Sequence, residues 1–129
     1  MSRTTKLLAV LLILCSPLLT LADTFDEIAA AIKSGNAKEI SKYFNANVEL
    51  TVLANEGVYS RQQAEIILKS FFAQHPPKNI VIQHRGSSAQ GARYAIATYE
   101  SNQSKFRTYI FMKDSGTGLM IHELRFEKE

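Results

Sequence analysis

The spacing of apolar residues along the chain predicts two short helices followed by a pair of strands. Thr24 and Glu27 have the spacing of a capping box, and apolar positions then follow a helical repeat as far as residue 32. Gly35 supplies a left-handed stop, and Asn36 caps a second short helix that forms a hairpin with the first. From residue 47 the period changes to two, which predicts a half-buried strand over 47–53 and a brief return strand at 58–59.

The rest of the chain predicts one longer helix and four strands. Ser60 and Gln63 form a second cap, which opens a helix through Gln74, and Pro76 and Pro77 end it. Strands are predicted over 79–85, 93–100, 105–113 and 119–127, with short polar turns between them. Short connections between neighbouring strands indicate antiparallel hairpins in a four-stranded meander. The fold class is therefore α+β.

Residues 1–22 have the pattern of a secretory signal peptide. Two cations precede a short apolar run, and Thr20 and Ala22 form a small-residue exit, so we expect cleavage after Ala22 and one domain over 23–129. A membrane anchor is the alternative, but the run over 7–22 is 16 residues long and contains Pro17. Spanning a bilayer takes roughly 20 residues. We therefore expect a periplasmic or secreted protein with no stable membrane insertion after cleavage.

The chain has a single cysteine, Cys15, and it lies in the leader. Lipidation of Cys15 is a second processing route, although Leu14 stands where that route generally needs a small residue. Removal of the leader at Ala22 leaves a domain without cysteine, which excludes disulfides, thiolate catalysis and cysteine metal sites. The domain then has thirteen basic and twelve acidic side chains, so its charge gives no reason to expect a nucleic-acid partner.

The order of the elements resembles that of a known superfamily. Two capped helices, a strand pair, a third helix and four closing strands are similar to the NTF2-like (cystatin-like, ketosteroid-isomerase-like) cone. The stretches over 47–53 and 59–72 are similar to the first strands and third helix of that superfamily. More narrowly, residues 24–127 resemble the DUF4783 family of exported, uncharacterised proteins of Bacteroidetes. The resemblance implies a strongly bent sheet wrapped around helices, but it implies no chemistry, since this fold hosts enzymes, binders and scaffolds.

The sequence departs from the enzymes of this superfamily at the positions that carry their chemistry. Isomerase and dehydratase members often have an aspartate just after a Val-Glu pair in the first strand, whereas Val48 and Glu49 are followed here by Leu50 and Thr51. The aspartate of the His–Asp pair in cyclase-like members has no match either. We therefore assign no catalytic residue, no metal ligand and no cofactor. We expect a non-enzymatic domain that binds a small molecule or a partner.

Alternation along the closing strands places two histidines, His84 and His122, on the side that faces the helices. A ligand cavity is therefore expected between the sheet and the helices, lined by Tyr43, Tyr59, His84, Thr98 and His122. One alternative is a small enzyme in which His84 or His122 acts as a general base. Another is that each histidine is a core or rim residue that hydrogen-bonds to a backbone carbonyl or a hydroxyl.

The opposite face of the meander is the expected interface of a homodimer. Alternation places on it Val81, Ala95, Ala97, Tyr99, Tyr109, Phe111 and Ile121, of which the last four are the main interface candidates. A sheet face that is open to water normally reads polar, and small residues beside aromatic ones suit a two-fold contact. The NTF2-like resemblance implies pairing through the same face. The alternative is a monomer in which arginine stems cover the patch.

Overall fold

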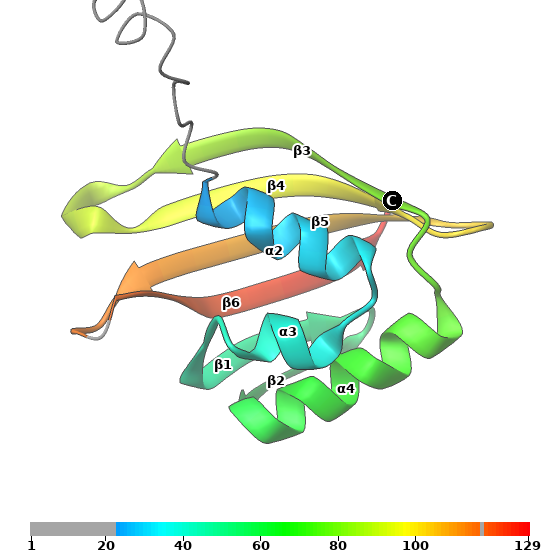
Figure 1. Ribbon diagram of the computed structural model, residues 1–129, viewed down its shortest axis with the longest axis horizontal. Coiled ribbons are helices and arrows are strands. Elements are labelled where there is room, and N and C mark those ends of the chain that lie inside the picture. The colour runs from blue at the N-terminus through cyan, green and yellow to red at the C-terminus, as the bar shows by residue number, and fades with distance from the viewer. Residues whose placement is uncertain (1–22, 117) are drawn as a thin grey trace, which may run out of the picture.

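The computed structural model describes residues 23–116 and 118–129, and the leader predicted over 1–22 lies outside them. The described chain contains α2 (Thr24–Lys33), α3 (Ala37–Ser41), β1 (Phe44–Val52), β2 (Asn55–Ser60), α4 (Arg61–Gln74), β3 (Asn79–Ser87), a 3₁₀ turn (Ala89–Gly91), β4 (Arg93–Glu100), β5 (Lys105–Asp114) and β6 (Leu119–Lys128). Figure 1 shows the helices on one side of the sheet. Within these residues, no helix is long and apolar enough to cross a membrane.

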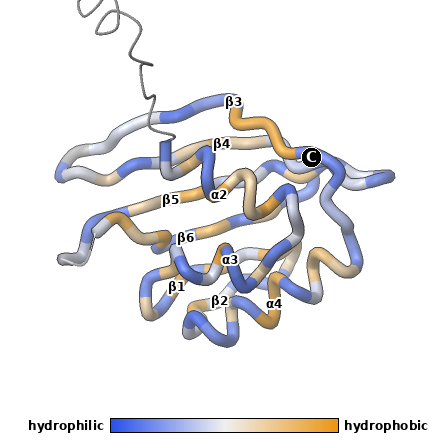
Figure 2. Tube along the Cα trace, viewed as in Figure 1, coloured by the Kyte–Doolittle hydropathy of each residue, from blue (hydrophilic) through white to orange (hydrophobic). Residues whose placement is uncertain are grey.

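The strands form one six-stranded sheet in the order β2-β1-β6-β5-β4-β3. The strands from β3 to β6 pair antiparallel with their neighbours along the chain, which confirms the predicted meander. β1 pairs antiparallel with β2 and parallel with β6, and this second pairing joins the strand pair to the meander. The tip between β4 and β5 is hydrophilic, and apolar and hydrophilic stretches are mixed along the strands (Figure 2). The predicted α+β class is confirmed.

The helix caps follow the sequence pattern at two of three starts. Ser60 and Gln63 form the predicted capping box of α4, and the side chain of Asn36 accepts a hydrogen bond from the third residue of α3. The predicted cap of α2 was wrong by one residue. Asp23 caps α2 in place of Thr24, because its carboxylate accepts from the amide of Phe25.

The first hairpin is longer than its sequence pattern suggested. β1 begins at Phe44 and β2 at Asn55, whereas the pattern placed the strands at 47–53 and 58–59. The turn therefore lies at Leu53 and Ala54, whereas the pattern left residues 54–57 between the two strands. Leu53 has a φ of +58°, a left-handed conformation that non-glycine residues seldom adopt, so no residue type in the sequence marked this turn.

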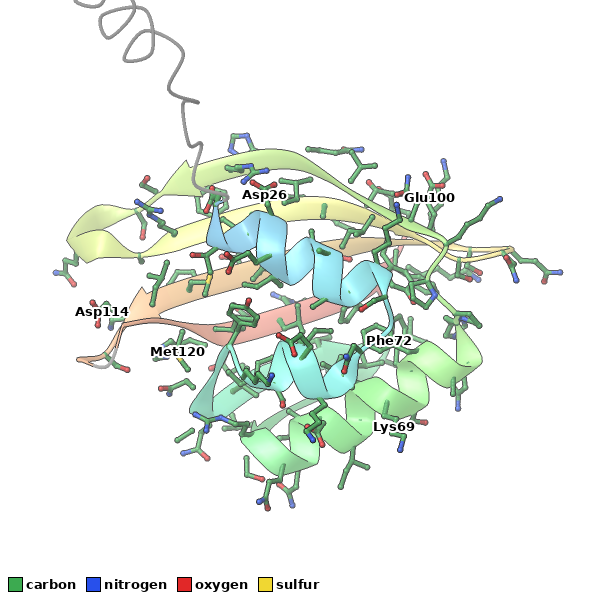
Figure 3. All side chains as sticks on the ribbon, in the orientation of Figure 1. Asp26, Lys69, Phe72, Glu100, Asp114 and Met120 are labelled. Atoms are coloured by element: carbon green, nitrogen blue, oxygen red, sulfur yellow. The ribbon has the colours of Figure 1, made fainter. Side chains whose placement is uncertain are left out.

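Aromatic rings fill the space between α4 and the sheet. The ring centroid of Phe71 is 4.7 Å from that of Phe126, and Phe72, labelled in Figure 3, packs edge-on against the same ring. Tyr99 is fully buried beside them, and its hydroxyl donates to the carbonyl of His75, the residue that ends α4. Burial raises the pKa of Tyr99.

Two irregularities in register decide which side chains reach each face of the sheet. The pairing of β3 with β4 shifts between Ile82 and His84, which leaves Gln83 as an extra residue. The pairing of β5 with β6 shifts so that His122 is extra between Ile121 and Glu123. Each bulge interrupts simple alternation and reverses the expected face on one side of it: His84 after the bulge in β3, and Ile121 and His122 before and within the bulge in β6. We call the face away from the helices the open face, and its residues include Glu49, Val58, His84, Tyr94, Ile96, Tyr109, Phe111, His122 and Glu123.

Candidate functional site

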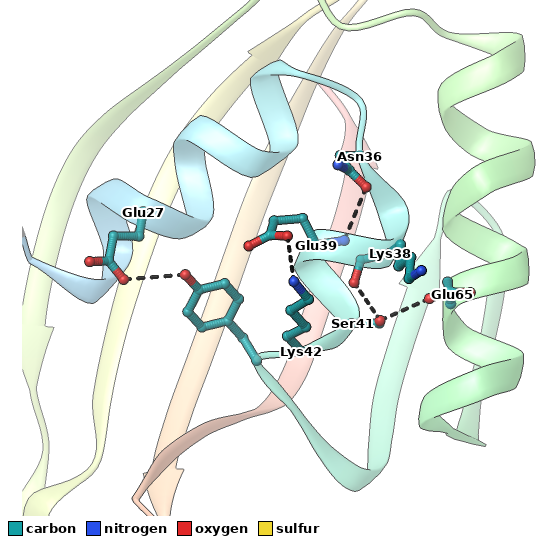
Figure 4. A network of polar contacts seen from close by, with 8 residues as sticks. Glu27, Asn36, Lys38, Glu39, Ser41, Lys42 and Glu65 are labelled. Atoms are coloured by element: carbon teal, nitrogen blue, oxygen red, sulfur yellow. Dashed lines mark hydrogen bonds and ion pairs between the residues drawn. The ribbon is translucent and has the colours of Figure 1, made fainter.

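The five residues predicted to line one cavity do not come together. Tyr43 and Tyr59 lie on the helix side, where both pack against the core. The Tyr43 hydroxyl donates to Glu27 at 3.2 Å, part of the polar contacts among α2, α3 and α4 in Figure 4. His84, Thr98 and His122 lie on the open face, so their expected position between the sheet and the helices was wrong.

The bulges and the hairpin register explain these reversals. His84 follows the bulge at Gln83, and His122 is itself the extra residue in β6. Thr98 was misplaced for a different reason: β4 reads apolar on both faces, so alternation alone cannot orient it. The hairpin register does orient it, since Tyr99 stands opposite the buried Phe106 of β5 and must share its face.

The same reversal moves part of the expected dimer interface into the core. Tyr99 and Ile121 are both 0% exposed, and Ala95 and Ala97 are buried as well, so the prediction that they lie on the open face was wrong. Tyr109, Phe111 and Val81 do lie on that face, and Val81 is 46% exposed. Ala95 and Ala97 therefore cannot contact a partner on the open face.

An apolar block that the pattern missed occupies the middle of the open face. Tyr94 stands opposite Phe111, and Ile96 stands opposite Tyr109, so the four side chains form two adjacent cross-strand pairs. All four are partly buried, and the Tyr94 and Tyr109 ring centroids are 6.3 Å apart. We call these four residues the open strip. In the β4–β5 hairpin Tyr99 lies opposite the buried Phe106, so Tyr94 and Ile96 must lie on the open face. This register would have identified them from the sequence.

Neighbouring residues of β3 hold one end of the open strip in place. The Nε2 atom of His84 lies 3.1 Å from the Tyr94 hydroxyl, and their rings are 5.6 Å apart. The Tyr94 ring lies over Gly86, where a Cβ would come within 2.3 Å of a ring carbon. Glycine at this position therefore allows Tyr94 to lie flat across β3.

Charged side chains surround the open strip on β1, β5 and β6. Glu123 of β6 is the half-buried member, with its side chain 23% exposed. Burial raises the pKa of the Glu123 carboxyl, and nearby carboxylates including Glu49 add to the rise, while Arg125 opposes it. Arg125 also forms an ion pair with Glu127, whose carboxylate oxygen lies 2.9 Å from the Arg125 Nε. Within the described part of the chain, no three acidic, histidine or cysteine side chains are placed to hold a metal ion.

The comparisons with known proteins bear on the fold. The family model DUF4783, a domain of unknown function, matches residues 25–127. A DUF4783 family protein from Bacteroides ovatus is 24% identical with a TM-score of 0.74, over 80% of this chain and 93% of that chain. One from Bacteroides uniformis is 23% identical with a TM-score of 0.75, over 81% and 95%. An uncharacterized cystatin fold protein from Novosphingobium aromaticivorans is 12% identical with a TM-score of 0.60, over 80% and 93%.

No curated protein matches the sequence. The family model covers nearly the whole described domain, and the similar structures have the same arrangement of helices on a bent sheet. The resemblance drawn from the element order is therefore confirmed. This chain belongs to the DUF4783 family, whose function is unknown, and its fold is NTF2-like, or cystatin-like.

Proposed function

We propose that this protein is a non-enzymatic binding domain that acts through the open strip, where a second copy of the chain is its partner. The observation that carries the proposal is the block of four apolar side chains, Tyr94, Ile96, Tyr109 and Phe111, on the face of the sheet away from the helices. An open sheet face normally carries polar residues, and contiguous apolar patches often mark interaction sites.

The charges around the open strip favour a second copy as the occupant. Glu49 and Glu123 lie on one side, and Arg107 and Arg125 lie close by on β5 and β6. A face with both signs of charge can meet its own copy without like-charge repulsion. Six strands about 4.8 Å apart make the sheet about 29 Å wide, and its strands are on average about 29 Å long. The open face of the sheet therefore has an area of roughly 800 Å². That area matches one partner's share of a standard interface.

The experiment is sedimentation equilibrium at micromolar concentration. We expect a dimer mass for the protein and a monomer mass for Phe111→Glu, because the substitution places a carboxylate in the middle of the contact. Circular dichroism should show the same helical signal for both, since Phe111 is only partly buried.

Ile66→Glu is the matched control. Ile66 is 67% exposed on α4, on the helix side of the molecule, so this variant should remain a dimer. A single species of monomer mass for the unaltered protein would refute the contact. Dissociation of Ile66→Glu together with Phe111→Glu would also count against the open strip as its location.

We also propose that the protein is exported and that its leader is removed after Ala22. The supporting observation is the sequence of residues 1–22, with two cations, a short apolar run and a small-residue exit. Mass mapping of the protein from the producing cells should find Asp23 as the first residue. An acylated Cys15 at that position would show the lipoprotein route instead.

The alternative of a small enzyme needs His84 or His122 to act as a base on the open face. The imidazole of His84 is already paired with the Tyr94 hydroxyl, which suits a positioning role better than proton abstraction. His122 lines a surface hollow together with Phe111, Glu49 and Glu123. Apolar walls with a few polar groups suit the binding of a ligand.

A further inference from the structure

A hollow of about 290 Å³ opens beside the open strip, over β1, β2, β5 and β6. We call it the His122 hollow, and it is lined by Asn47, Glu49, Val58, Phe111, His122 and Glu123. Val58 and Phe111 give it apolar walls, and its other side chains can all accept hydrogen bonds. This combination of apolar walls and a few convergent polar groups is typical of small-molecule sites.

The carboxylates of the hollow repel one another. Glu49 and Glu123 are direct partners across the parallel β1–β6 pairing, so their side chains project from neighbouring positions. The nearest guanidinium nitrogen of Arg125 is 3.7 Å from Glu123, and the Nε atom of Arg125 is engaged by Glu127. The raised pKa of Glu123 records this incomplete compensation together with burial. A positive charge in the hollow would relieve the repulsion.

His122 adds an independent sign that a hydrogen-bond donor belongs here. Its Nε2 atom is buried and has no hydrogen-bond partner among residues 23–116 and 118–129. A buried polar atom without a partner destabilises the folded protein, because it has lost its hydrogen bonds to water. The His122 ring lines the hollow, so a ligand bound there lies beside the ring that carries this atom. In the tautomer with its proton on Nδ1, Nε2 is an acceptor.

We propose that the His122 hollow binds a small organic cation, a primary amine attached to an apolar body. The ammonium group donates to the carboxylates of Glu49 and Glu123 and to Nε2 of His122, and the Phe111 ring contacts the cation and its body. One water takes up about 30 Å³ in the liquid, so the hollow has room for about ten non-hydrogen atoms. The proposal does not require self-association, although Phe111 belongs to both the open strip and the hollow.

The test is a titration of the protein with benzylammonium chloride, followed by backbone amide shifts in nuclear magnetic resonance. Benzyl alcohol and benzoate are the matched neutral and anionic probes of the same size. We expect saturable shifts in the millimolar range for benzylammonium, concentrated at Glu49, His122 and Glu123. The two other probes should give no saturable shift at these residues.

A double variant, Glu49→Gln with Glu123→Gln, should weaken benzylammonium binding by about tenfold or more, since both charge-assisted hydrogen bonds are lost. Glu39→Gln, which removes a carboxylate beside Lys42 on the helix side, should bind as the unaltered protein does. Equal binding of benzyl alcohol, unchanged binding in the double variant, or no binding of benzylammonium would each overturn the proposal. Sedimentation of the same samples reports self-association separately, and circular dichroism checks that the variants fold.

Discussion

At the scale of single residues, Glu123 is a carboxylate held half-buried on the open face. Its folded-state pKa is raised, so the folded protein binds the proton more tightly than the unfolded chain does. The stability contributed by this group is therefore present at low pH. It is lost as the pH rises from the ordinary glutamate value through the raised value. Above that pH range, the charged form of Glu123 destabilises the folded protein.

Glu123→Gln should consequently raise the free energy of unfolding at pH 7, because the amide keeps the shape of the side chain and removes the buried charge. The gain should shrink as the pH falls toward the ordinary glutamate pKa of 4.5 and below it, where both side chains are neutral. Urea denaturation across this range measures the difference. A variant that is less stable than the original protein at pH 7 would show that the contact with Arg125 outweighs burial.

At the scale of elements, α4 is fixed to the rest of the molecule at both ends. Its first turn has the capping box of Ser60 and Gln63, and its last residues are held through the carbonyl of His75. The donor to that carbonyl is Tyr99 of β4, so a buried side chain of the sheet positions the end of the helix. The contact lies on the helix side of β4, the side on which the hairpin register places Tyr99.

Tyr99→Phe should lower the free energy of unfolding by about 1–2 kcal/mol, because the ring stays packed while the part-buried carbonyl of His75 loses its donor. Tyr59→Phe is the control: Tyr59 is a half-buried tyrosine of β2, and its hydroxyl removal should change stability by at most a few tenths of a kcal/mol. Chemical denaturation of both variants gives the comparison. Equal effects would show that the Tyr99 hydroxyl contributes nothing specific.

Local sequence patterns predicted elements better than faces. The caps at Asn36 and Ser60 and the four closing strands followed from residue types and spacing, because capping and alternation act over a few residues. The bulges at Gln83 and His122 have no such local mark, since neither site carries a glycine or a proline. Each bulge therefore misplaced the histidine beside or within it, and with them the expected cavity.

At the scale of the whole molecule, the short polar turns predicted the four-stranded meander. No local sequence signal predicted that β1 would pair with the last strand of the meander, β6. The parallel pairing of β1 with β6 joins segments that lie at opposite ends of the domain, such as Phe44 with Ile121. This pairing creates the His122 hollow, because it brings Glu49 beside Glu123. The candidate site was thus only partly visible in the sequence: Tyr109, Phe111 and His122 were singled out, but their grouping depended on long-range register.

The parallel β1–β6 pairing also has a consequence for the timing of folding. The sheet cannot close until the last strand is available, and pairings between distant segments are slow because a long loop must be closed first. A growing chain that lacks Leu119–Lys128 has β1 without its second neighbour and a core without Phe126. We therefore expect such a chain to stay unfolded until its synthesis is nearly complete. If the protein is exported as proposed above, we expect this delay to keep its chain unfolded enough to pass through a secretion channel.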